Sequence, residues 1–280
     1  MTTGYYFYVY LGTENYFVDL GEAIAVCLRQ NGIEALVSTF LPGPRHKDHQ
    51  LVVLGANNIK FCKLPVAIPD RAVILNFEQL SDASPFNTSE YLELMKKHGA
   101  WDHSHINVAW LSSKGITAKL FPFGFSPSFV FRTPELEEED IDVLFYGSRN
   151  DRRDRLMEEL KRLPGDRKIS FHINNLWGLD REQTIRRAKI VVNLHSGAGG
   201  HVESPRIFMA LSNKKCVVSE RGINQEEYRY LEEGVAWFPD GDAKAFYAAV
   251  EHYLTHPDER KAIGEKGYQV LSERPCGVPL

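Results

Sequence analysis

The residues best suited to chemistry in this sequence lie between Ile190 and Glu220. A loop of small residues, Ser196-Gly197-Ala198-Gly199-Gly200, follows an apolar run there and leads into a helical pattern that carries Arg206. The backbone N–H groups of such a loop can face an anion, and the forked guanidinium of an arginine adds a charged contact. The segment therefore predicts a binding site for a nucleotide diphosphate. The alternative interpretation is a tight strand-to-helix turn with a solvated arginine.

A second candidate anion site follows the apolar run 141–146. Its turn begins with Gly147 and Ser148, and the helical segment after it carries Arg152 and Arg153. Arginines in the first turn of a helix oppose the helix dipole, which favours acidic residues there. Because an anionic ligand would remove this conflict, we interpret the arginines of this turn as ligand contacts, with at least one of them at the surface.

Three carboxylates are candidates for acid–base chemistry. Glu78 follows the apolar run 72–75, at the point where a general base would lie in a parallel α/β sheet. Asp102 and Glu14 are the second choices. The structural alternatives are that Glu78 caps a turn or pairs with a nearby basic residue, and that Asp102 or Ser104 caps the helix that follows.

The elements that must position these residues alternate along the chain. Apolar runs of strand length alternate with amphipathic helical patterns in both halves, which predicts parallel α/β sheets. Such sheets bind ligands at the carboxyl ends of their strands, where Glu14 and Glu78 fall. The predicted strands include 5–11, 34–39, 51–54, 72–75, 118–121, 141–146, 169–173, 190–194 and 235–238, and the predicted helices include 89–98, 152–162, 180–188, 243–254 and 258–271. No GxGxxG motif follows the first strand, so we do not expect a nicotinamide-dinucleotide site.

The composition changes between Gly124 and Ile141. Pro127 and Pro134 bracket a stretch that becomes acidic, which is typical of an exposed linker. We therefore predict a first Rossmann-like domain over residues 1–125, a linker over 126–140 and a second domain with terminal helices over 141–280.

The overall composition is that of a soluble globular protein. The chain has 280 residues, of which 43% are hydrophobic and 25% charged, and its net charge of −4 does not mark a nucleic-acid binder. The four cysteines form no CxxC pair, so we expect buried free thiols at Cys27 and Cys216, no structural zinc and a reducing, cytoplasmic compartment. No stretch resembles a signal peptide or a transmembrane span.

The second half resembles the sugar-nucleotide domain of GT-B glycosyltransferases. The resemblance covers residues 141–272 and rests on "DVLFYGS…RR…L", "RAKIVVNLHSG…E..R.F.AL…K.CVVSE" and "FPDGDAKAFYAAVEHYLTHPDERKAIGEKG". It is similar to family-1-like and spore-maturation-type enzymes, with a fainter likeness to phage DNA β-glucosyltransferases in "DVLFYGS" and "PRIFMALSNKKCVV". The first half fits more loosely, through "NFEQL", "WDHS" and "LFPFGF".

This resemblance implies two Rossmann-like domains that face each other across a cleft. It also implies transfer of a sugar, expected to be a hexose, from a nucleoside diphosphate sugar to a hydroxyl acceptor, with no metal. A UDP-sugar is the favoured donor; the acceptor is a saccharide, a small molecule or, as the weakest alternative, a modified DNA base. The implied donor contacts are Gly147, Ser148, Arg152, Arg153, Trp177, His195, Ser196, Gly197, Gly199, Gly200, Glu203, Arg206 and Glu220. Trp177 either stacks on the base or covers an edge of the core.

One position departs from the family pattern. Met209 stands where the family carries an acidic residue that holds the ribose hydroxyls, and a thioether cannot accept two such hydrogen bonds. Ribose recognition is then expected from Glu203 or Glu220. The alternative is a non-catalytic nucleotide-sugar-binding protein. Asp240-Gly241-Asp242 resembles a metal motif loosely, and we interpret it as a turn and a helix N-cap.

Overall fold

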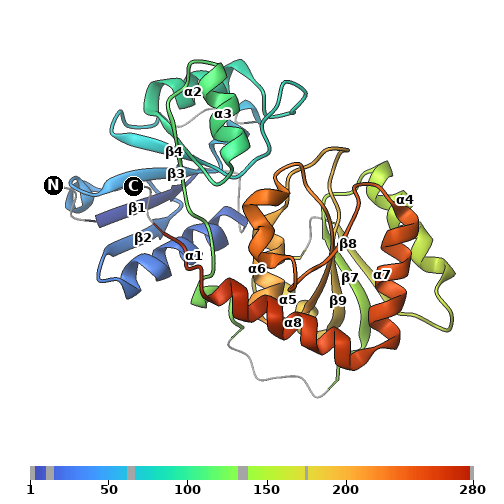
Figure 1. Ribbon diagram of the computed structural model, residues 1–280. Helices are drawn as coiled ribbons and strands as arrows, with labels where there is room; N and C mark the ends of the chain where they lie inside the picture. Colours follow the sequence, from blue (N-terminus) through green and yellow to red (C-terminus); the bar gives the residue numbers. More distant parts are fainter. Residues whose placement is uncertain (1–3, 11–15, 62–66, 132–137, 174–175, 278–280) are drawn as a thin grey trace. The chain divides into compact units, whose positions relative to one another are not determined.

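The chain folds into two units, each built on its own parallel sheet (Figure 1). The first unit runs to Ser128 and also takes in the chain from Pro275 onward, and the second unit is Phe129–Arg274. The computed structural model describes residues 4–10, 16–61, 67–131, 138–173 and 176–277. The predicted base Glu14 lies outside these residues.

The first unit contains a six-stranded sheet in the order β2-β1-β3-β4-β5-β6. Its strands are β1 (Gly4–Val9), β2 (Glu34–Ser38), β3 (Gln50–Leu54), β4 (Ala72–Asn76), β5 (Ala100–Asp102) and β6 (Ala118–Leu120). Its helices are α1 (Tyr16–Gln30), α2 (Ser89–His98) and α3 (His105–Ser113), with short 3-10 turns at Pro44–His46, Ala56–Phe61 and Pro127–Phe129. All the neighbouring strands pair in parallel, as the alternating pattern predicts.

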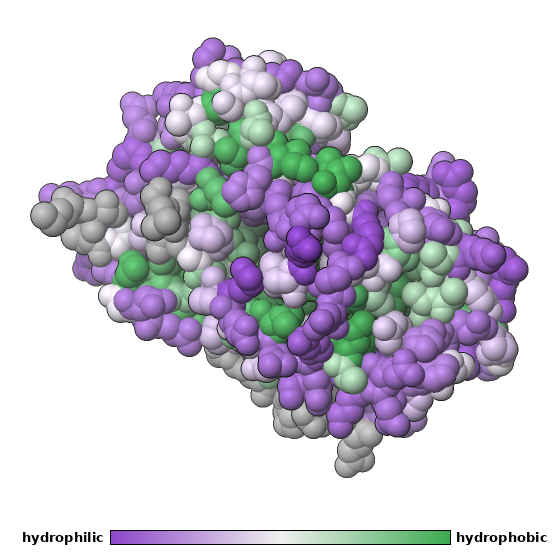
Figure 2. All heavy atoms as spheres, viewed as in Figure 1, coloured by the Kyte–Doolittle hydropathy of each residue, from purple (hydrophilic) through white to green (hydrophobic). Residues whose placement is uncertain are grey.

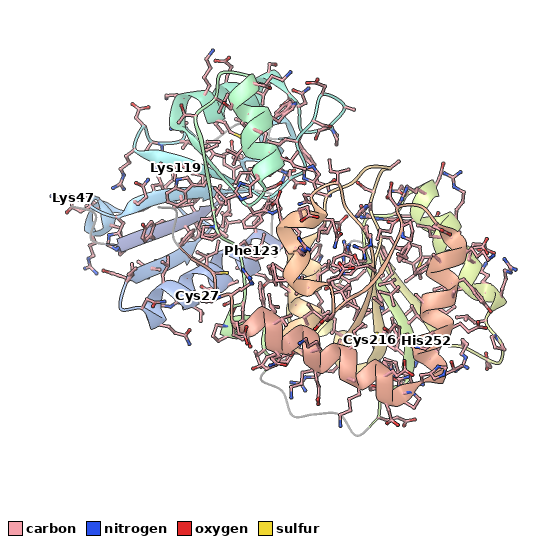
Figure 3. All side chains as sticks on the ribbon, in the orientation of Figure 1. Cys27, Lys47, Lys119, Phe123, Cys216 and His252 are labelled. Carbon is pink, nitrogen blue, oxygen red and sulfur yellow. The ribbon has the colours of Figure 1, made fainter. Side chains whose placement is uncertain are left out.

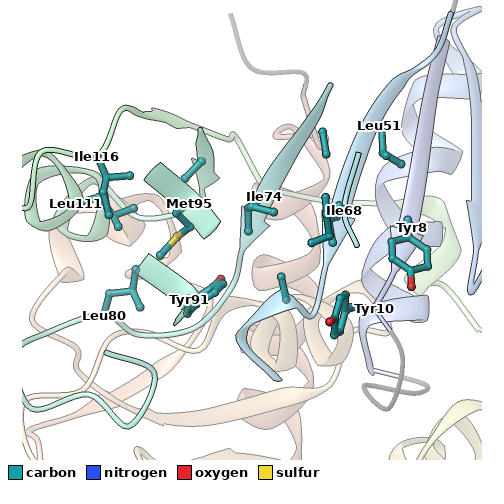
Figure 4. Close-up of a cluster of buried hydrophobic side chains, with 14 of the residues drawn as sticks. Tyr8, Tyr10, Leu51, Ile68, Ile74, Leu80, Tyr91, Met95, Leu111 and Ile116 are labelled. Carbon is teal, nitrogen blue, oxygen red and sulfur yellow. The ribbon is translucent and has the colours of Figure 1, made fainter. Parts of the chain in front are cut away.

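The side chains of successive residues in β1 pack alternately into two different hydrophobic cores. Tyr6 and Tyr8 pack with residues of α2 such as Tyr91, while Phe7 and Val9 join the cluster that includes the apolar face of α1. Side chains along a strand point alternately to its two faces, so an unbroken apolar strand must be covered on both. Figure 4 shows the cluster that contains Tyr8, Ile74, Tyr91 and Met95.

The second unit contains a five-stranded parallel sheet in the order β11-β10-β9-β7-β8. Its strands are β7 (Ile141–Gly147), β8 (Ile169–Ile173), β9 (Ala188–Asn193), β10 (Cys216–Glu220) and β11 (Ala236–Phe238). Its helices are α4 (Asp151–Glu159), α5 (Gly178–Arg187), α6 (Ser204–Ser212), α7 (Ala243–Thr255) and α8 (Pro257–Ser272), with 3-10 turns at Leu160–Arg162 and Gln225–Leu231. Phe145, Val192 and Val218 pack with residues of α4 and α7.

The division of the chain differs from the predicted boundaries in two places. The chain from Pro275 onward belongs to the first unit, because Cys276 and Gly277 donate backbone hydrogen bonds to Phe125 and Pro122 at 3.0 and 2.9 Å. Parts of the predicted linker are also packed rather than exposed. Ser126 is buried in the first unit, and Phe129 accepts a 2.7 Å bond from Asn213 in the second.

Most of the face seen in Figure 2 is covered by polar side chains. Within the described residues no helix has the length and apolar character needed to cross a bilayer. The predicted buried free thiols are confirmed at Cys27 and Cys216, which Figure 3 labels, and Cys276 is a third. Burial raises the pKa of Cys216 to about 12, so this thiol is inert. Cys62 lies outside the described residues.

Candidate functional site

The carboxyl ends of the strands in the second unit bring the predicted donor residues together. Ser148 follows β7, His195 follows β9, Glu220 ends β10 and Asp240 follows β11. These four strands are neighbours and run parallel, so the segments after them share one edge of the sheet. Residues that are far apart in the sequence therefore meet there.

Arg152 lies at the centre of an ion-pair network at this edge. Its Nη1 and Nη2 donate to Oε2 and Oε1 of Glu220 at 2.8 and 2.5 Å, and Nη2 also donates to Asp240 at 2.7 Å. Glu220 is fully buried and accepts further bonds from the backbone N–H groups of His195 and Gly241. The hydrogen bond to Glu220 raises the pKa of Arg152. The chain's own carboxylates therefore compensate this arginine, where the sequence suggested an anionic ligand.

Arg153 is held in the same way and is almost completely buried. It donates to the carbonyl oxygens of Leu194 and Ser148, to the Ser148 hydroxyl at 2.6 Å and to Glu203 at 2.8 Å. Burial lowers the pKa of Arg153. Burial also acts to raise the pKa of Glu203, but the charges of Arg206 and Arg153 outweigh it and lower that pKa overall. Arg153 is thus a fixed support beneath the turn after β7.

Arg206 is held less completely than the other two arginines. Its Nη1 contacts Glu203 and Asn193, and its guanidinium lies over the rings of Phe145 and Tyr146, 5.4 and 5.6 Å from their centroids. Within the part of the chain that the structure describes, its buried Nε has no hydrogen-bond partner. At least one N–H group of Arg206 is therefore not engaged by the described part of the chain, although it is buried.

Gly147 allows Arg206 to lie against the end of β7. A Cβ atom added at this glycine would lie 2.9 Å from Nη2 of Arg206, closer than such contacts occur. The residue also has a φ of 150°, which side-chain-bearing residues rarely adopt. The predicted turn glycine is therefore required for close approach as well as for backbone conformation.

The glycine-rich loop between β9 and α6 is fastened at both ends and exposed between them. Asn150, which caps α4, donates to the carbonyl of Ser196 at 3.0 Å, and the backbone N–H of Gly199 donates to Asp240 at 2.8 Å. Ser196, Gly197 and Gly199 are exposed, whereas Gly200 is buried against the His195 ring. Backbone in this loop thus lies open to solvent next to the arginine cluster.

In the first unit, Glu78 and Asp102 share a polar network at the ends of β4 and β5. Asp102 is fully buried and accepts bonds from Asn76 at 2.7 Å, from Asn107 at 3.1 Å and from the backbone N–H of Ser104 at 2.8 Å. This carboxylate holds the strand ends together, and its burial keeps it from contacting an acceptor substrate. Ser104 is the N-cap residue of α3, as predicted, but its side chain makes no capping bond.

Glu78 is the half-buried carboxylate of this network. Its Oε1 accepts a 3.0 Å bond from Asn57, and its backbone is held by Asn76 and Asn107. The three asparagines were not among the predicted site residues. Asn76 could have been found, because it ends the strand directly before the candidate base, whereas Asn57 and Asn107 reach the site only through the fold.

Comparison with known proteins assigns the chain to a family. A model of the glycosyl transferase-like family matches residues 134–275. The chain belongs to the glycosyl transferase-like family. Among curated proteins no sequence matches.

Solved structures give the fold of this glycosyltransferase over nearly its full length. HepE of Anabaena in complex with UDP-glucose has 12% identity, covers 97% of this chain and 95% of its own, and has a TM-score of 0.62. WaaG, a glycosyltransferase involved in lipopolysaccharide biosynthesis, has 11% identity, 95% of both chains covered and a TM-score of 0.58. Sucrose-phosphate synthase from Thermosynechococcus elongatus has 11% identity, 97% and 95% covered and a TM-score of 0.59. The predicted GT-B fold and the glycosyltransferase assignment are confirmed.

One group at the carboxyl edge of the second sheet has the composition of a metal site. Ligand atoms of His195, Glu220 and Asp240 lie within 4.8 Å of one another. Both oxygens of Glu220, however, already accept bonds from Arg152, and that guanidinium also contacts Asp240. A cation there would lie against a fixed positive charge, so the geometry favours an ion-pair network. Asp242 caps α7 through a 2.9 Å bond from the N–H of Ala245, as predicted.

The expected ribose contacts differ in their accessibility. Glu220 has no exposed side-chain surface, so it supports Arg152, whereas the side chain of Glu203 is 20% exposed between its two arginines. Met209 is 8% exposed on α6. Trp177 is half-buried at the N-cap position of α5. Of the two predicted replacements for the family's acidic residue, only Glu203 has a surface that a ligand can reach.

Proposed function

We propose that this glycosyltransferase moves a sugar from a UDP-sugar to a hydroxyl acceptor, with the donor diphosphate at the carboxyl edge of the second sheet. The observation that carries the proposal is the position of Arg206, a forked cation that lies against Gly147 at the end of β7, on the sheet edge that also carries the exposed glycine-rich loop. The choice of donor is supported by the structures of HepE, which hold UDP and UDP-glucose.

In this proposal the arginines have different roles. Arg206 and the backbone N–H groups of the 196–200 loop neutralise the negative charge that develops on the departing UDP, which is the largest contribution available to such a site. Arg152 and Arg153 position the loop and the turn after β7, because their donors are already used by Glu220, Asp240 and Glu203. Glu203 is the proposed contact for the ribose hydroxyls.

Glu78 is the proposed general base. The acceptor oxygen attacks the anomeric carbon, the bond from that carbon to the β-phosphate oxygen breaks, and the acceptor proton passes to Glu78. Glu78 has this role if the transfer is a single displacement that inverts the anomeric centre. Asn57 holds the carboxylate through its 3.0 Å bond and leaves the group partly exposed, as a proton acceptor requires.

Binding and turnover test the proposal in sequence. The first measurement is the melting temperature with UDP, GDP, CDP and dTDP, alone and as their sugars; a nucleotide at 100 times its dissociation constant stabilises by about 2.7 kcal/mol. The second is slow release of UDP from UDP-sugars without an acceptor. Arg206→Ala should abolish both effects, and Arg229→Ala, at a side chain that is 82% exposed, should change neither.

Two outcomes would contradict the proposal. If no nucleotide raises the melting temperature, the donor site is not at this edge. If a nucleotide sugar binds tightly and no donor turns over with any hydroxyl acceptor, the chain is a binding protein that has kept the fold and lost the reaction.

A further inference from the structure

Three side chains meet at the amino end of the first sheet, the opposite edge from Glu78. Glu34 is the first residue of β2, His49 directly precedes β3, and His46 ends the 3-10 turn Pro44–His46. One ligand atom from each of the three lies within 4.8 Å of the other two. Nε2 of His49 and Oε1 of Glu34 are 3.4 Å apart, and the two imidazole centroids are 5.0 Å apart. None of these residues belongs to the proposed donor site.

We propose that His46, His49 and Glu34 bind a divalent transition-metal ion, with zinc as the expected occupant. Two imidazoles and one carboxylate form a ligand set that zinc prefers, whereas calcium and magnesium prefer oxygen ligands alone. Two ligand atoms at about 2.1 Å from a tetrahedral zinc lie roughly 3.4 Å apart, which is the separation of His49 and Glu34.

The turn between Pro44 and His49 places the side chains of His46 and His49 on the same side of the backbone. The turn is helical, because the N–H groups of His46 and His49 donate to the carbonyls of Gly43 and His46 at 3.0 and 3.2 Å. Residues three apart in such a turn lie one above the other. The guanidinium of Arg71 donates to the carbonyls of His46, Lys47 and His49, which holds the turn in this shape. Lys47 marks the turn in Figure 3.

Gly4 makes room for the site between β2 and β3. A Cβ atom there would lie 2.6 Å from the carbonyl oxygen of Glu34 and 3.1 Å from Cδ2 of His49. Strand β1 separates the two ligand-bearing strands, and Gly4 is directly opposite Glu34 in the register. A side chain at this position would crowd the backbone of Glu34 and the imidazole of His49.

The three side chains differ in burial: His49 is buried, His46 is half-buried, and Glu34 is 56% exposed, so an ion can reach the group from solvent. The His49 side chain is only 6% exposed, and within the described residues the buried Nδ1 of His46 has no hydrogen-bond partner. The His46 ring also contacts the ring of Tyr6, with the two centroids 5.4 Å apart and the planes tilted by 41°. Burying an imidazole nitrogen without a partner is costly, and a metal ion or its bound water would supply one.

Zinc binding to the untagged full-length protein, stripped with a chelator, tests the site. Calorimetry should give one zinc per chain at these residues. His46→Gln and Glu34→Gln should each weaken binding at least tenfold, since even the loss of an outer partner of a ligand costs about that much. His105→Gln and Glu93→Gln replace exposed residues of the same unit and should leave binding unchanged.

The visible spectrum of bound cobalt distinguishes metal ligation by these residues from a purely structural role. Cobalt held by two nitrogens and a carboxylate should give intense visible bands that His46→Gln removes, and zinc should displace it. A protein that takes up no zinc at micromolar concentrations would overturn the proposal. So would variants at residues 34 and 46 that bind zinc as the wild type does, because the ion would then lie elsewhere, for example at His195.

Discussion

Arg152 and Glu220 are joined by two parallel hydrogen bonds, each from a different terminal nitrogen to a different carboxylate oxygen, at 2.8 and 2.5 Å. Glu220 has no exposed side-chain surface and Arg152 only 15%, so the pair is shielded from solvent. Removing one member of a shielded pair leaves the other as an uncompensated charge. The ends of β9 and β10 and the turn after β11 all depend on this contact.

Arg152→Met should therefore reduce the free energy of unfolding by about 3 kcal/mol. Arg149→Met is the matched control, because the Arg149 side chain is 63% exposed and pairs with Asp154 at the surface, where such pairs contribute less than about 1 kcal/mol. Urea unfolding of both variants at neutral pH measures the difference. Equal losses would mean that Arg152 is not a structural residue and is available to a ligand.

Gly147→Ala should weaken UDP binding by displacing Arg206. The new methyl group would meet Nη2 of Arg206, and the backbone would also be strained at its φ of 150°. Gly165→Ala separates these effects, because Gly165 has a φ of 81° with no atom within 4 Å of an added Cβ. Both variants should lose stability, by about 1 kcal/mol or more from strain. Only Gly147→Ala should raise the dissociation constant for UDP; an equal rise in both would leave strain as the sole cause.

Glu78→Gln should lower kcat for sugar transfer by roughly 100- to 10,000-fold, since a positioned general base contributes about that much. The amide keeps the shape and can still accept the bond from Asn57, so KM for the donor should stay near its original value. Glu93→Gln, at a carboxylate that is 75% exposed in the same unit, is the control. The kinetics require an acceptor found by screening hydroxyl compounds for UDP release. A variant that retains full kcat would rule out Glu78 as the base.

His201 should make the protein less stable as the pH falls from about 6.5 to about 4. Burial, aided by the charge of His195, lowers the pKa of His201 from 6.5 to about 4. Between these values the unfolded chain binds a proton that the folded chain does not bind. The free energy of unfolding therefore decreases as the pH is lowered, by about 3 kcal/mol in total. Below pH 4 both states are protonated and this contribution changes no further.

His201→Asn should remove this part of the pH dependence. The difference in unfolding free energy between wild type and variant should shrink by up to about 3 kcal/mol as the pH is lowered from 6.5 to 4. The same substitution at the exposed His105 should leave the pH profile unchanged. Parallel profiles for wild type and His201→Asn would contradict the lowered pKa.

Local signals in the sequence predict the elements well where caps and periodicity agree. The predicted helix 89–98 coincides with α2, because Thr88 accepts a capping bond from the N–H of Tyr91 and Gly99, with a φ of 74°, ends the helix. Within the described residues the apolar strand runs are confirmed to within about two residues, because strands buried on both faces are marked by continuous apolar composition. Fold class follows from the alternation of these elements along the chain.

The partners of charged residues could not be predicted in the same way. The conflict between Arg152, Arg153 and the helix dipole is visible in the sequence, and a ligand is the natural local resolution. The structure resolves it with Glu220 and Glu203, which lie 68 and 50 residues further along the chain. The grouping of His49 with Glu34 could not be predicted for the same reason, because it joins distant parts of the sequence. It depends on the register of three strands and on the absence of a side chain at Gly4.

The return of the chain to the first unit has a consequence for how the two units are connected. The peptide crosses between them once after Ser128 and again after Arg274, so the first unit is built from two separate segments of the chain. A cut after Arg274 leaves the units covalently joined through the first crossing. A cut after Ser128 removes the covalent link of residues 1–128 to the rest of the chain, so that non-covalent contacts, such as the backbone hydrogen bonds of Cys276 and Gly277, must hold the first unit together. A recombinant first unit would need the segment from Pro275 grafted behind Ser128 to restore the bonds of Cys276 to Gly124 and Phe125.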